Sequence, residues 1–253
     1  MNWIVSFIIA LVIVPSPEPP THPPPPTAVF PAIVALSIGD SLTVGTDGSA
    51  TASYRGELSR LMRLTGQPHT WKVVGAGGSK CSYWVTRIGD LITLHHPDVI
   101  FLDCGTNDTP TDNTEADYRI ILSTAINRGV QVVASLIGIP DMRSATNSVR
   151  PYILTWMHNT NLAIKRALVD YPQVRVADMQ RVPANPEFLQ VDGIHLTSRA
   201  EAAYGQLFYQ AAQPMRGWRT LAQMGTYEMC GLSGTWVEDP WPIPDVAYRV
   251  CRS

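Results

Sequence analysis

Two segments far apart in the chain carry side chains that together could cleave an ester bond. Ser41 follows an apolar run that ends at Gly39, and His195 stands three residues after Asp192. A serine hydroxyl attacks a carbonyl carbon when a base removes its proton, and a carboxylate that orients the base completes the arrangement. The sequence therefore predicts Ser41 as a nucleophile, His195 as its general base and Asp192 as the residue that orients the imidazole.

Acyl transfer also requires hydrogen-bond donors for the oxyanion of the tetrahedral intermediate. We expect these donors to be the backbone N–H groups of Ser41 and Gly77 and the side-chain amide of Asn107, and the loss of one such donor typically costs about 3 kcal/mol of barrier. Each residue alone has an ordinary interpretation, because a serine after a strand can cap a helix and Gly-Thr-Asn-Asp can form a turn. Their joint occurrence favours an active site.

Alternating apolar and amphipathic segments must position these residues. The pattern predicts strands over 32–38, 70–77, 97–105, 129–138 and 174–178, and helices over 52–64, 85–94, 116–127, 153–168 and 198–212. Strands that are apolar on both faces and alternate with helices indicate a parallel sheet covered by helices on both sides. The predicted fold class is α/β, and ligands of such sheets bind beyond the carboxyl ends of the strands, where the candidate residues lie.

Four short motifs resemble the conserved blocks of the SGNH (GDSL) hydrolase superfamily. They are Gly-Asp-Ser-Leu at 39–42, the glycine at 77, Gly-Thr-Asn-Asp at 105–108 and Asp-Gly-Ile-His at 192–195. The resemblance extends from about residue 33 to residue 212. It implies a three-layer αβα sandwich with a flavodoxin-like five-stranded parallel sheet, and it assigns the triad and oxyanion-hole roles to the same residues.

The chain departs from the family pattern at two positions. Gly75 stands where an asparagine is common, and Leu196 follows the histidine where a proline is common. The pair Tyr54–Arg55 resembles secreted bacterial esterases that deacetylate carbohydrates, although these residues could equally be a core ring and a surface ion pair.

The resemblance implies a serine esterase that hydrolyses short acyl esters, such as acetyl esters, of carbohydrate or cell-envelope substrates. Three alternatives remain open. One is an acyltransferase that uses the same site, another is a lipase- or thioesterase-type member of the superfamily, and the third is a non-catalytic envelope-binding protein. The presence of a complete set of candidate catalytic residues counts against the third alternative, because a binding protein does not need them.

Composition excludes several other classes of function. The net charge is −2 and the Lys and Arg residues are scattered, so nucleic acid is not an expected partner. The six histidines and four cysteines lack the spacing of zinc ligands, and no phosphate-binding loop occurs. We therefore expect no metal and no cofactor, a small-molecule or glycan ester as the partner, and a monomer.

The two ends of the chain differ in composition from its centre. The apolar stretch 3–14 is shorter than the roughly 20 residues of a membrane span, so segment 1–14 is interpreted as a signal or a membrane anchor. Segment 15–31 is a linker in which nine of seventeen residues are proline. The predicted hydrolase domain covers 32–213, and 214–253 is a Trp-, Cys- and Pro-rich extension. We expect a secreted protein or a membrane-anchored one with an extracytoplasmic domain.

The cysteines fit export. Cys230 and Cys251 could close a disulfide worth about 3 kcal/mol in an oxidising compartment. Cys104 ends an apolar strand pattern and is expected to be a small buried residue, whereas Cys81 could pair or stay free.

Overall fold

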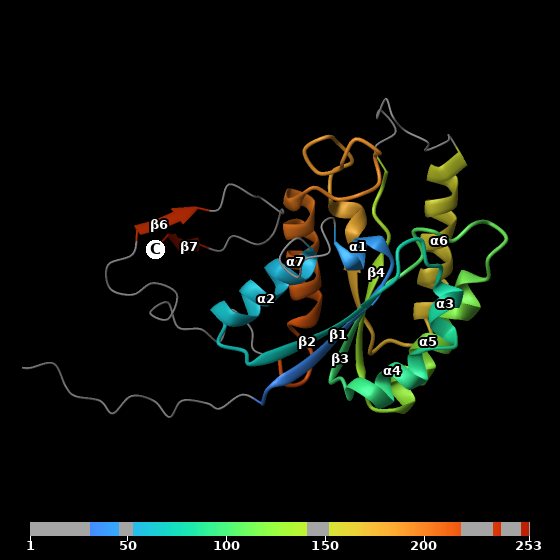
Figure 1. Ribbon diagram of the computed structural model, residues 1–253, viewed down its shortest axis with the longest axis horizontal. Helices are drawn as coiled ribbons and strands as arrows, with labels where there is room; N and C mark the ends of the chain where they lie inside the picture. The colour runs from blue at the N-terminus through green and yellow to red at the C-terminus, as the bar shows by residue number, and fades with distance from the viewer. Residues whose placement is uncertain (1–30, 46–52, 141–151, 219–234, 239–248, 253) are drawn as a thin grey trace, which may run out of the picture.

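Five parallel strands form the centre of the molecule, with helices on both faces (Figure 1). The computed structural model describes residues 31–45, 53–140, 152–218, 235–238 and 249–252. The apolar segment 3–14, the proline-rich linker up to residue 30 and Cys230 lie outside the described residues. In chain order the elements are β1 (Ile33–Gly39), α1 (Ser41–Val44), α2 (Tyr54–Leu64), β2 (His69–Gly75), α3 (Cys81–Val85), α4 (Ile88–His95), β3 (Val99–Asp103), α5 (Thr114–Asn127), β4 (Gln131–Leu136), α6 (Tyr152–Leu168), β5 (Arg175–Asp178), the 3-10 turn η1 (Met179–Arg181), α7 (Ser198–Ala212), β6 (Thr235–Glu238) and β7 (Arg249–Arg252).

The strand order is β2-β1-β3-β4-β5, and every neighbouring pair is parallel. This is the flavodoxin-like order that the motifs imply. Strand β1 lies between β2 and β3, and its last residue, Gly39, is in register with Gly75 on one side and Asp103 on the other. The segments that follow these three strands therefore begin side by side at the carboxyl end of the sheet.

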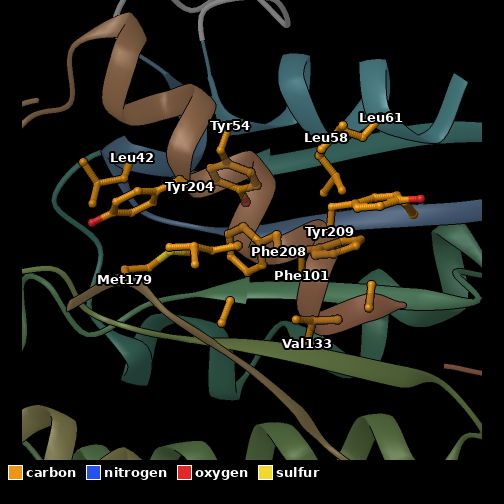
Figure 2. Packing of buried hydrophobic residues seen from close by; sticks show 14 of the residues in the cluster. Leu42, Tyr54, Leu58, Leu61, Phe101, Val133, Met179, Tyr204, Phe208 and Tyr209 are labelled. Atoms are coloured by element: carbon orange, nitrogen blue, oxygen red, sulfur yellow. The ribbon is translucent and has the colours of Figure 1, made fainter. Parts of the chain in front are cut away.

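Two hydrophobic clusters make the structure a three-layer sandwich. One cluster joins α2 and α7 to one sheet face, with Tyr54, Phe101 and Phe208 in ring contact at its centre (Figure 2). The other joins α3, α4, α5 and α6 to the opposite face, where Trp84 and Tyr118 are fully buried. The three-layer α/β fold expected from the sequence is confirmed.

The segment after residue 212 continues the first cluster for a short distance. Met215 and Trp218 are buried, and the indole of Trp218 contacts the rings of Phe101 and Tyr209. Further on, β6 and β7 form an antiparallel pair, which the sequence pattern did not indicate. In the described parts of the chain no helix combines the length and the apolar character needed to cross a membrane.

Local differences from the sequence prediction have physical causes. The helix expected over 85–94 corresponds to α4, which begins only at Ile88. A further helix that the pattern did not predict, α3, precedes it and is separated from it by Thr86 and Arg87. The Arg87 side chain donates to the carbonyl of Tyr83 and stacks on its ring, which closes the end of α3. The expectation that all strands are apolar on both faces is wrong for the two edge strands, because the residues of β2 are half-buried or exposed and Arg175 and Val176 of β5 are exposed.

Candidate active site

Ser41 begins α1, a single helical turn that starts directly after β1. The carboxylate of Asp40 caps this turn by accepting a hydrogen bond from the backbone N–H of Leu42 over 2.9 Å. Packing also requires a glycine at position 39. A Cβ on Gly39 would lie 2.1 Å from the carbonyl oxygen of Asp103 and 2.2 Å from Oγ1 of Thr43. The close approach of β3 and α1 therefore fixes the position of the serine.

The other end of α1 is held by Arg55 of α2. Its buried guanidinium donates to the carbonyl oxygen of Thr43 and, over 3.4 Å, to that of Val44. A cation at the carboxyl end of a helical turn satisfies carbonyl groups that lack helical partners. The alternative of a surface ion pair for this residue is wrong, whereas the expectation of a core ring is confirmed for the fully buried Tyr54.

Gly75 belongs to the same packing arrangement. A Cβ on Gly75 would lie 2.6 Å from Cγ2 of Val44, so the end of β2 approaches α1 too closely for any side chain. This explains the departure from the asparagine that is common at this position. Gly77 lies beyond it, is exposed, and has no atom within 4 Å of the place where a Cβ would stand.

Asp192 and His195 share one tight turn in the loop before α7. The backbone N–H of Gln190 donates to the carbonyl of His195 over 2.7 Å, and Gly193 takes the left-handed conformation at φ +73°. Buried Leu189 and Leu196 pair across the base of this turn. The turn is thereby closed by its own backbone and anchored in the core.

The structure brings the three predicted triad residues into one hydrogen-bonded row. Nε2 of His195 lies 3.0 Å from Oγ of Ser41, and Nδ1 of His195 lies 2.5 Å from Oδ2 of Asp192. Oδ1 of Asp192 accepts from the backbone N–H groups of Ile194 and His195. Partial burial raises the pKa of Asp192, but the hydrogen bonds from the imidazole and the two N–H groups outweigh it and leave this pKa below its ordinary value.

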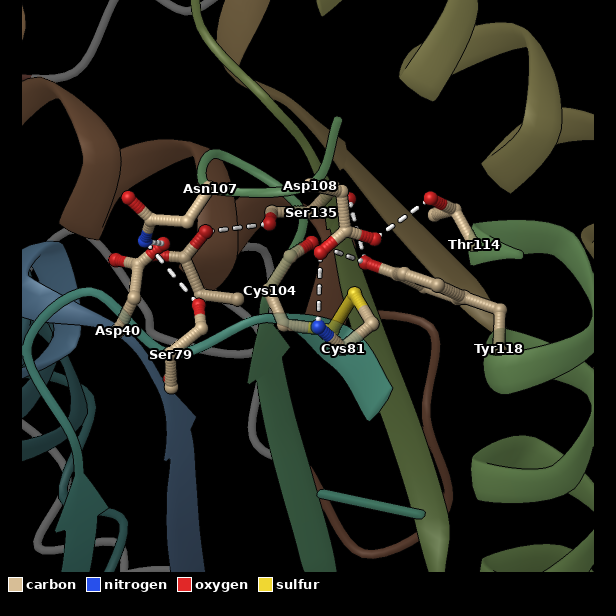
Figure 3. The surroundings of a disulfide bond; sticks show 10 residues. Asp40, Ser79, Cys81, Cys104, Asn107, Asp108, Thr114, Tyr118 and Ser135 are labelled. Atoms are coloured by element: carbon tan, nitrogen blue, oxygen red, sulfur yellow. Dashed lines mark hydrogen bonds between the residues drawn. A yellow bond between two sulfur atoms is a disulfide. The ribbon is translucent and has the colours of Figure 1, made fainter. Parts of the chain in front are cut away.

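Asn107 lies at the same edge of the sheet, in the turn after β3. Its Nδ2 atom donates to Oδ2 of Asp40 over 3.2 Å and to the carbonyl oxygen of Ser79 over 3.1 Å (Figure 3). Both hydrogens of the amide thus have acceptors. Donation to an oxyanion requires one of these two bonds to be shared or exchanged.

A disulfide joins Cys81 at the start of α3 to Cys104 after β3 (Figure 3). The expectation that Cys104 is only a small buried residue is therefore wrong, and the partner of Cys81 is now identified. Asp108 reinforces the same junction, because its carboxylate accepts from the N–H of Cys81 over 3.0 Å and from Oγ1 of Thr114 over 2.6 Å. The segment that contains Gly77 and the segment that contains Asn107 are tied together covalently.

Two further carboxyl groups lie beneath the candidate site, and one of them was missed in the sequence. Asp40 and Asp103 are buried at the ends of β1 and β3. Oδ1 of Asp103 accepts from Oγ of Ser135 over 2.6 Å, while its Oδ2 has no hydrogen-bond partner. A charged residue at the end of the otherwise apolar run Val-Ile-Phe-Leu-Asp was the signal that could have found it.

A pocket of about 180 Å³ opens at the carboxyl end of β4. Strand β4 is the neighbour of β3, so this pocket lies on the sheet edge that also carries Asn107, although no triad residue lines it. Asn161 fixes its floor by bonding both the N–H and the carbonyl of Ile137. The lining is mainly apolar and consists of Gly138, Ile139, Pro140, Leu154, Met157, His158, Asn161 and Gln180.

The arrangement can support nucleophilic attack by a hydroxyl group. An imidazole that donates from Nδ1 to a carboxylate presents a lone pair on Nε2, which can accept the proton of Ser41. Among the described residues no group of three or more His, Cys, Asp or Glu side chains could hold a metal ion.

Comparison with known proteins points to one family. The model of the GDSL-like lipase/acylhydrolase family matches residues 37–203. No curated protein sequence matches the chain.

Solved structures with the same fold include several esterases. The lipase/acylhydrolase from Enterococcus faecalis is 22% identical with a TM-score of 0.58, covering 72% of this chain and 96% of that chain. The Clostridium thermocellum family 3 carbohydrate esterase is 17% identical with a TM-score of 0.58, covering 73% and 97%. Esterase EstA from Pseudoalteromonas sp. is 13% identical with a TM-score of 0.59, covering 72% and 97%. The expected resemblance to SGNH hydrolases is confirmed.

Proposed function

Because the chain belongs to the GDSL-like lipase/acylhydrolase family, we propose that this SGNH-type hydrolase cleaves short-chain acyl esters through an acyl-enzyme on Ser41. The observation that carries the proposal is the 3.0 Å contact between Oγ of Ser41 and Nε2 of His195, two residues 154 positions apart. Such a contact between a serine hydroxyl and an oriented imidazole is what activation of the nucleophile requires.

In the acylation step, Oγ of Ser41 attacks the ester carbonyl carbon while Nε2 of His195 takes its proton. Asp192 accepts the Nδ1 hydrogen and stabilises the imidazolium that forms. The imidazolium then gives its proton to the leaving alcohol, and the bond between the carbonyl carbon and the alcohol oxygen breaks. In deacylation water attacks the acyl group, and the same imidazole moves the proton from water to Ser41.

The negative charge of the tetrahedral intermediate is proposed to lie against the N–H groups of Ser41 and Gly77 and the amide of Asn107. The open space beside Gly77 supports this placement, since a substrate oxygen can approach its backbone there. For Asn107, donation to the oxyanion replaces one of its bonds to Asp40 and Ser79.

Hydrolysis is favoured over transfer to another acceptor by the exposure of the base. The side chains of His195 and Asp192 are 39% and 42% exposed, so solvent water has access to the base that would activate it. An acyltransferase that suppresses hydrolysis excludes water from its intermediate.

Short acyl groups and carbohydrate alcohols are the proposed substrate. The pocket beside β4 is small and mainly apolar, and we assign it to the acyl group. The similarity in fold to a carbohydrate esterase is compatible with a sugar as the alcohol part.

Export of the enzyme to an oxidising compartment is likewise proposed. The disulfide between Cys81 and Cys104 supports it, because disulfides persist where thiols are not kept reduced. The apolar stretch 3–14 supplies either a signal or an anchor in this proposal.

The test is a chain-length series of p-nitrophenyl esters from acetate to palmitate, measured with the wild-type protein and Ser41→Ala. We expect acetate and butyrate to have the highest kcat/KM and Ser41→Ala to lose at least about a thousandfold in kcat. Equal turnover by both proteins would overturn the mechanism, and a maximum at long chains would overturn the substrate class. Product analysis with added alcohols measures transfer.

The acyl-pocket assignment has a matched control on one helix. Leu154 and Leu162 of α6 are both 39% exposed, but only Leu154 lines the pocket. We expect Leu154→Trp to lower kcat/KM for butyrate relative to acetate, and Leu162→Trp to leave the ratio unchanged. An equal effect of both substitutions would place the acyl group elsewhere.

A further inference from the structure

We propose that Asp40 and Asp103 form a buried carboxyl pair that holds one proton, and that loss of this proton at alkaline pH weakens oxyanion stabilisation by Asn107. The proton-holding part stands on the geometry of the pair alone. The catalytic part rests on the proposed function, and the two parts are tested by separate measurements.

The pair lies at the ends of two hydrogen-bonded strands. Gly39 of β1 is in register with Asp103 of β3, and Asp40 directly follows Gly39. Asp40 is fully buried and Asp103 is 1% exposed. Two ionised carboxylates in such a position, without a counter-ion, are strongly unfavourable, and retention of one proton removes one of the charges.

The hydrogen bonds leave a place for this proton. Oδ1 of Asp103 accepts from Ser135, and Oδ2 is the buried atom without a partner. The carboxyl group of Asp40 accepts from the N–H of Leu42 and from Asn107. A protonated carboxyl group can donate as well as accept, so a retained proton adds a donor to a buried cluster in which Oδ2 of Asp103 is an acceptor without a partner.

Among the described residues, the groups that act most strongly on the charges of the pair include no cation. The charge of Asp40 is influenced by Asp103, by Asp108, by the side chain of Thr106 and by the N–H of Leu42. That of Asp103 is influenced by Ser135. Arg55 interacts instead with Tyr54 and Glu201.

Three tyrosines face the pair from the surrounding helices. They are Tyr54 of α2, Tyr118 of α5 and Tyr204 of α7. Burial raises the pKa of each phenol well above its ordinary value, so all three stay neutral in the range considered. His195 is the other titratable group of the site, and its two nitrogens bond Ser41 and Asp192.

Burial also explains when the proton leaves. It raises the pKa of Asp103 to about 6 and, together with the charge of Asp103, raises that of Asp40 to about 8. Between these values the pair holds about one proton, and this proton is lost progressively as the pH rises through about 8.

Loss of the proton acts on Asn107 in two ways. An ionised Asp40 accepts from Nδ2 more strongly than a neutral acid does, so it competes with the oxyanion for the same N–H group. The second negative charge also opposes the charge that develops on the substrate oxygen. Both effects lower kcat/KM as the pH rises.

The catalytic part is tested by the pH profile of kcat/KM for p-nitrophenyl acetate. The rate with Ser41→Ala is subtracted at each pH, because this ester hydrolyses spontaneously in alkali. For the wild-type protein we expect the value at pH 9.5 to fall to about a tenth or less of the value at pH 7. A wild-type profile that stays flat up to pH 9.5 would overturn this part.

Asp103→Asn separates the pair from other alkaline effects. The amide nitrogen supplies a permanent donor in place of the proton, and the ratio of kcat/KM at pH 9.5 to that at pH 7 is expected to return to about 1. The control is Asp90→Asn. Asp90 is exposed and belongs to α4, which lies at the opposite end of the strands from α1 (Figure 1). An Asp103→Asn profile that declines like that of the control contradicts the proposal.

Two measurements test the proton without any activity assay. Because the folded-state pKa values are raised, the folded protein binds more protons than the unfolded chain between about pH 4 and pH 8. The contribution of the raised pKa values to the free energy of unfolding is fully present below about pH 4 and is lost as the pH rises to about 8. We therefore expect the Tm of the wild-type protein to fall over this window more than the Tm of Asp103→Asn. Parallel Tm curves would overturn the shared proton.

The second measurement needs only the wild-type protein. Infrared difference spectra between pH 7 and pH 9.5 should show the loss of a protonated-carboxyl band. If Asp103→Asn fails to fold, this band decides the question, and its absence at pH 7 would refute the pair. If the protein proves inactive on esters, the Tm and infrared results still stand, so failure of the proposed function and failure of the pair are distinguishable.

Discussion

The side-chain amide of Asn107 donates to the carboxyl group of Asp40, 67 residues earlier in the chain, over 3.2 Å. Asp40 is also the residue that caps the helical turn of Ser41. The proposed oxyanion donor and the support of the proposed nucleophile therefore form one hydrogen-bonded unit, and substitutions in this unit are expected to affect the rate more than substrate binding.

Asn107→Ala is expected to lower kcat for p-nitrophenyl acetate by about 10²–10³-fold with little change in KM, because it removes a donor that acts on the transition state. Steady-state kinetics measures both constants. Asn113→Ala is the control, since Asn113 stands at the start of α5 without a side-chain capping bond. A loss below about threefold in kcat would show that another group binds the oxyanion.

Asp192→Asn is expected to lower kcat by about 10³–10⁴-fold, because a neutral amide neither fixes the imidazole tautomer nor stabilises the imidazolium. The depressed pKa of Asp192 keeps this carboxylate ionised well into the acid range. Asp170→Asn, which breaks a surface ion pair with Arg119, should leave kcat unchanged. Activity of Asp192→Asn within tenfold of wild type would mean that His195 does not depend on this partner.

Arg55→Met is expected to lower the free energy of unfolding by about 2 kcal/mol, because it leaves the carbonyls of buried Thr43 and half-buried Val44 without their donor. Denaturant unfolding measures this change, and kcat should fall as well because α1 loses its support. Arg60→Met is the control, as Arg60 pairs with Glu57 and is more exposed. If the two variants were equally stable, Arg55 would not hold the turn.

Replacement of both Cys81 and Cys104 by serine is expected to lower the free energy of unfolding by about 3 kcal/mol, the value for closing a loop of this length. Unfolding of the wild-type protein in the presence of a reductant should give the same loss. Unchanged stability in reductant, with reduction verified by thiol titration, would contradict a stabilising role for this bond.

Much of the fold follows from hydrophobic pattern because most strands are buried. The runs that form β1, β3 and β4 contain the continuous apolar residues of strands covered on both faces, and α7 agrees with its predicted range, 198–212. The one-turn helix α1 was missed, since four residues carry no period. The antiparallel pair of β6 and β7 was missed for a similar reason.

The candidate site, like the fold, could be predicted from the sequence only in part. Ser41, Asp192 and His195 are identifiable from the sequence because their residue types and their spacing are those of acyl-transfer chemistry. The disulfide is not identifiable, because the pairing of Cys81 with Cys104 depends on how the segments after β2 and β3 are placed. The role of Asp103 depends on register, which brings it beside Gly39 only when β1 and β3 pair.

The turn that carries both Asp192 and His195 has a mechanical consequence. The bond between these residues and the bond between Gln190 and His195 lie within the turn itself. A displacement of the turn as a rigid body would therefore leave the acid–base pair assembled and change a single distance of the row, the one to Ser41. The hydrogen-bonded row thus has one adjustable contact, and the proposed proton transfer from Ser41 begins across that contact.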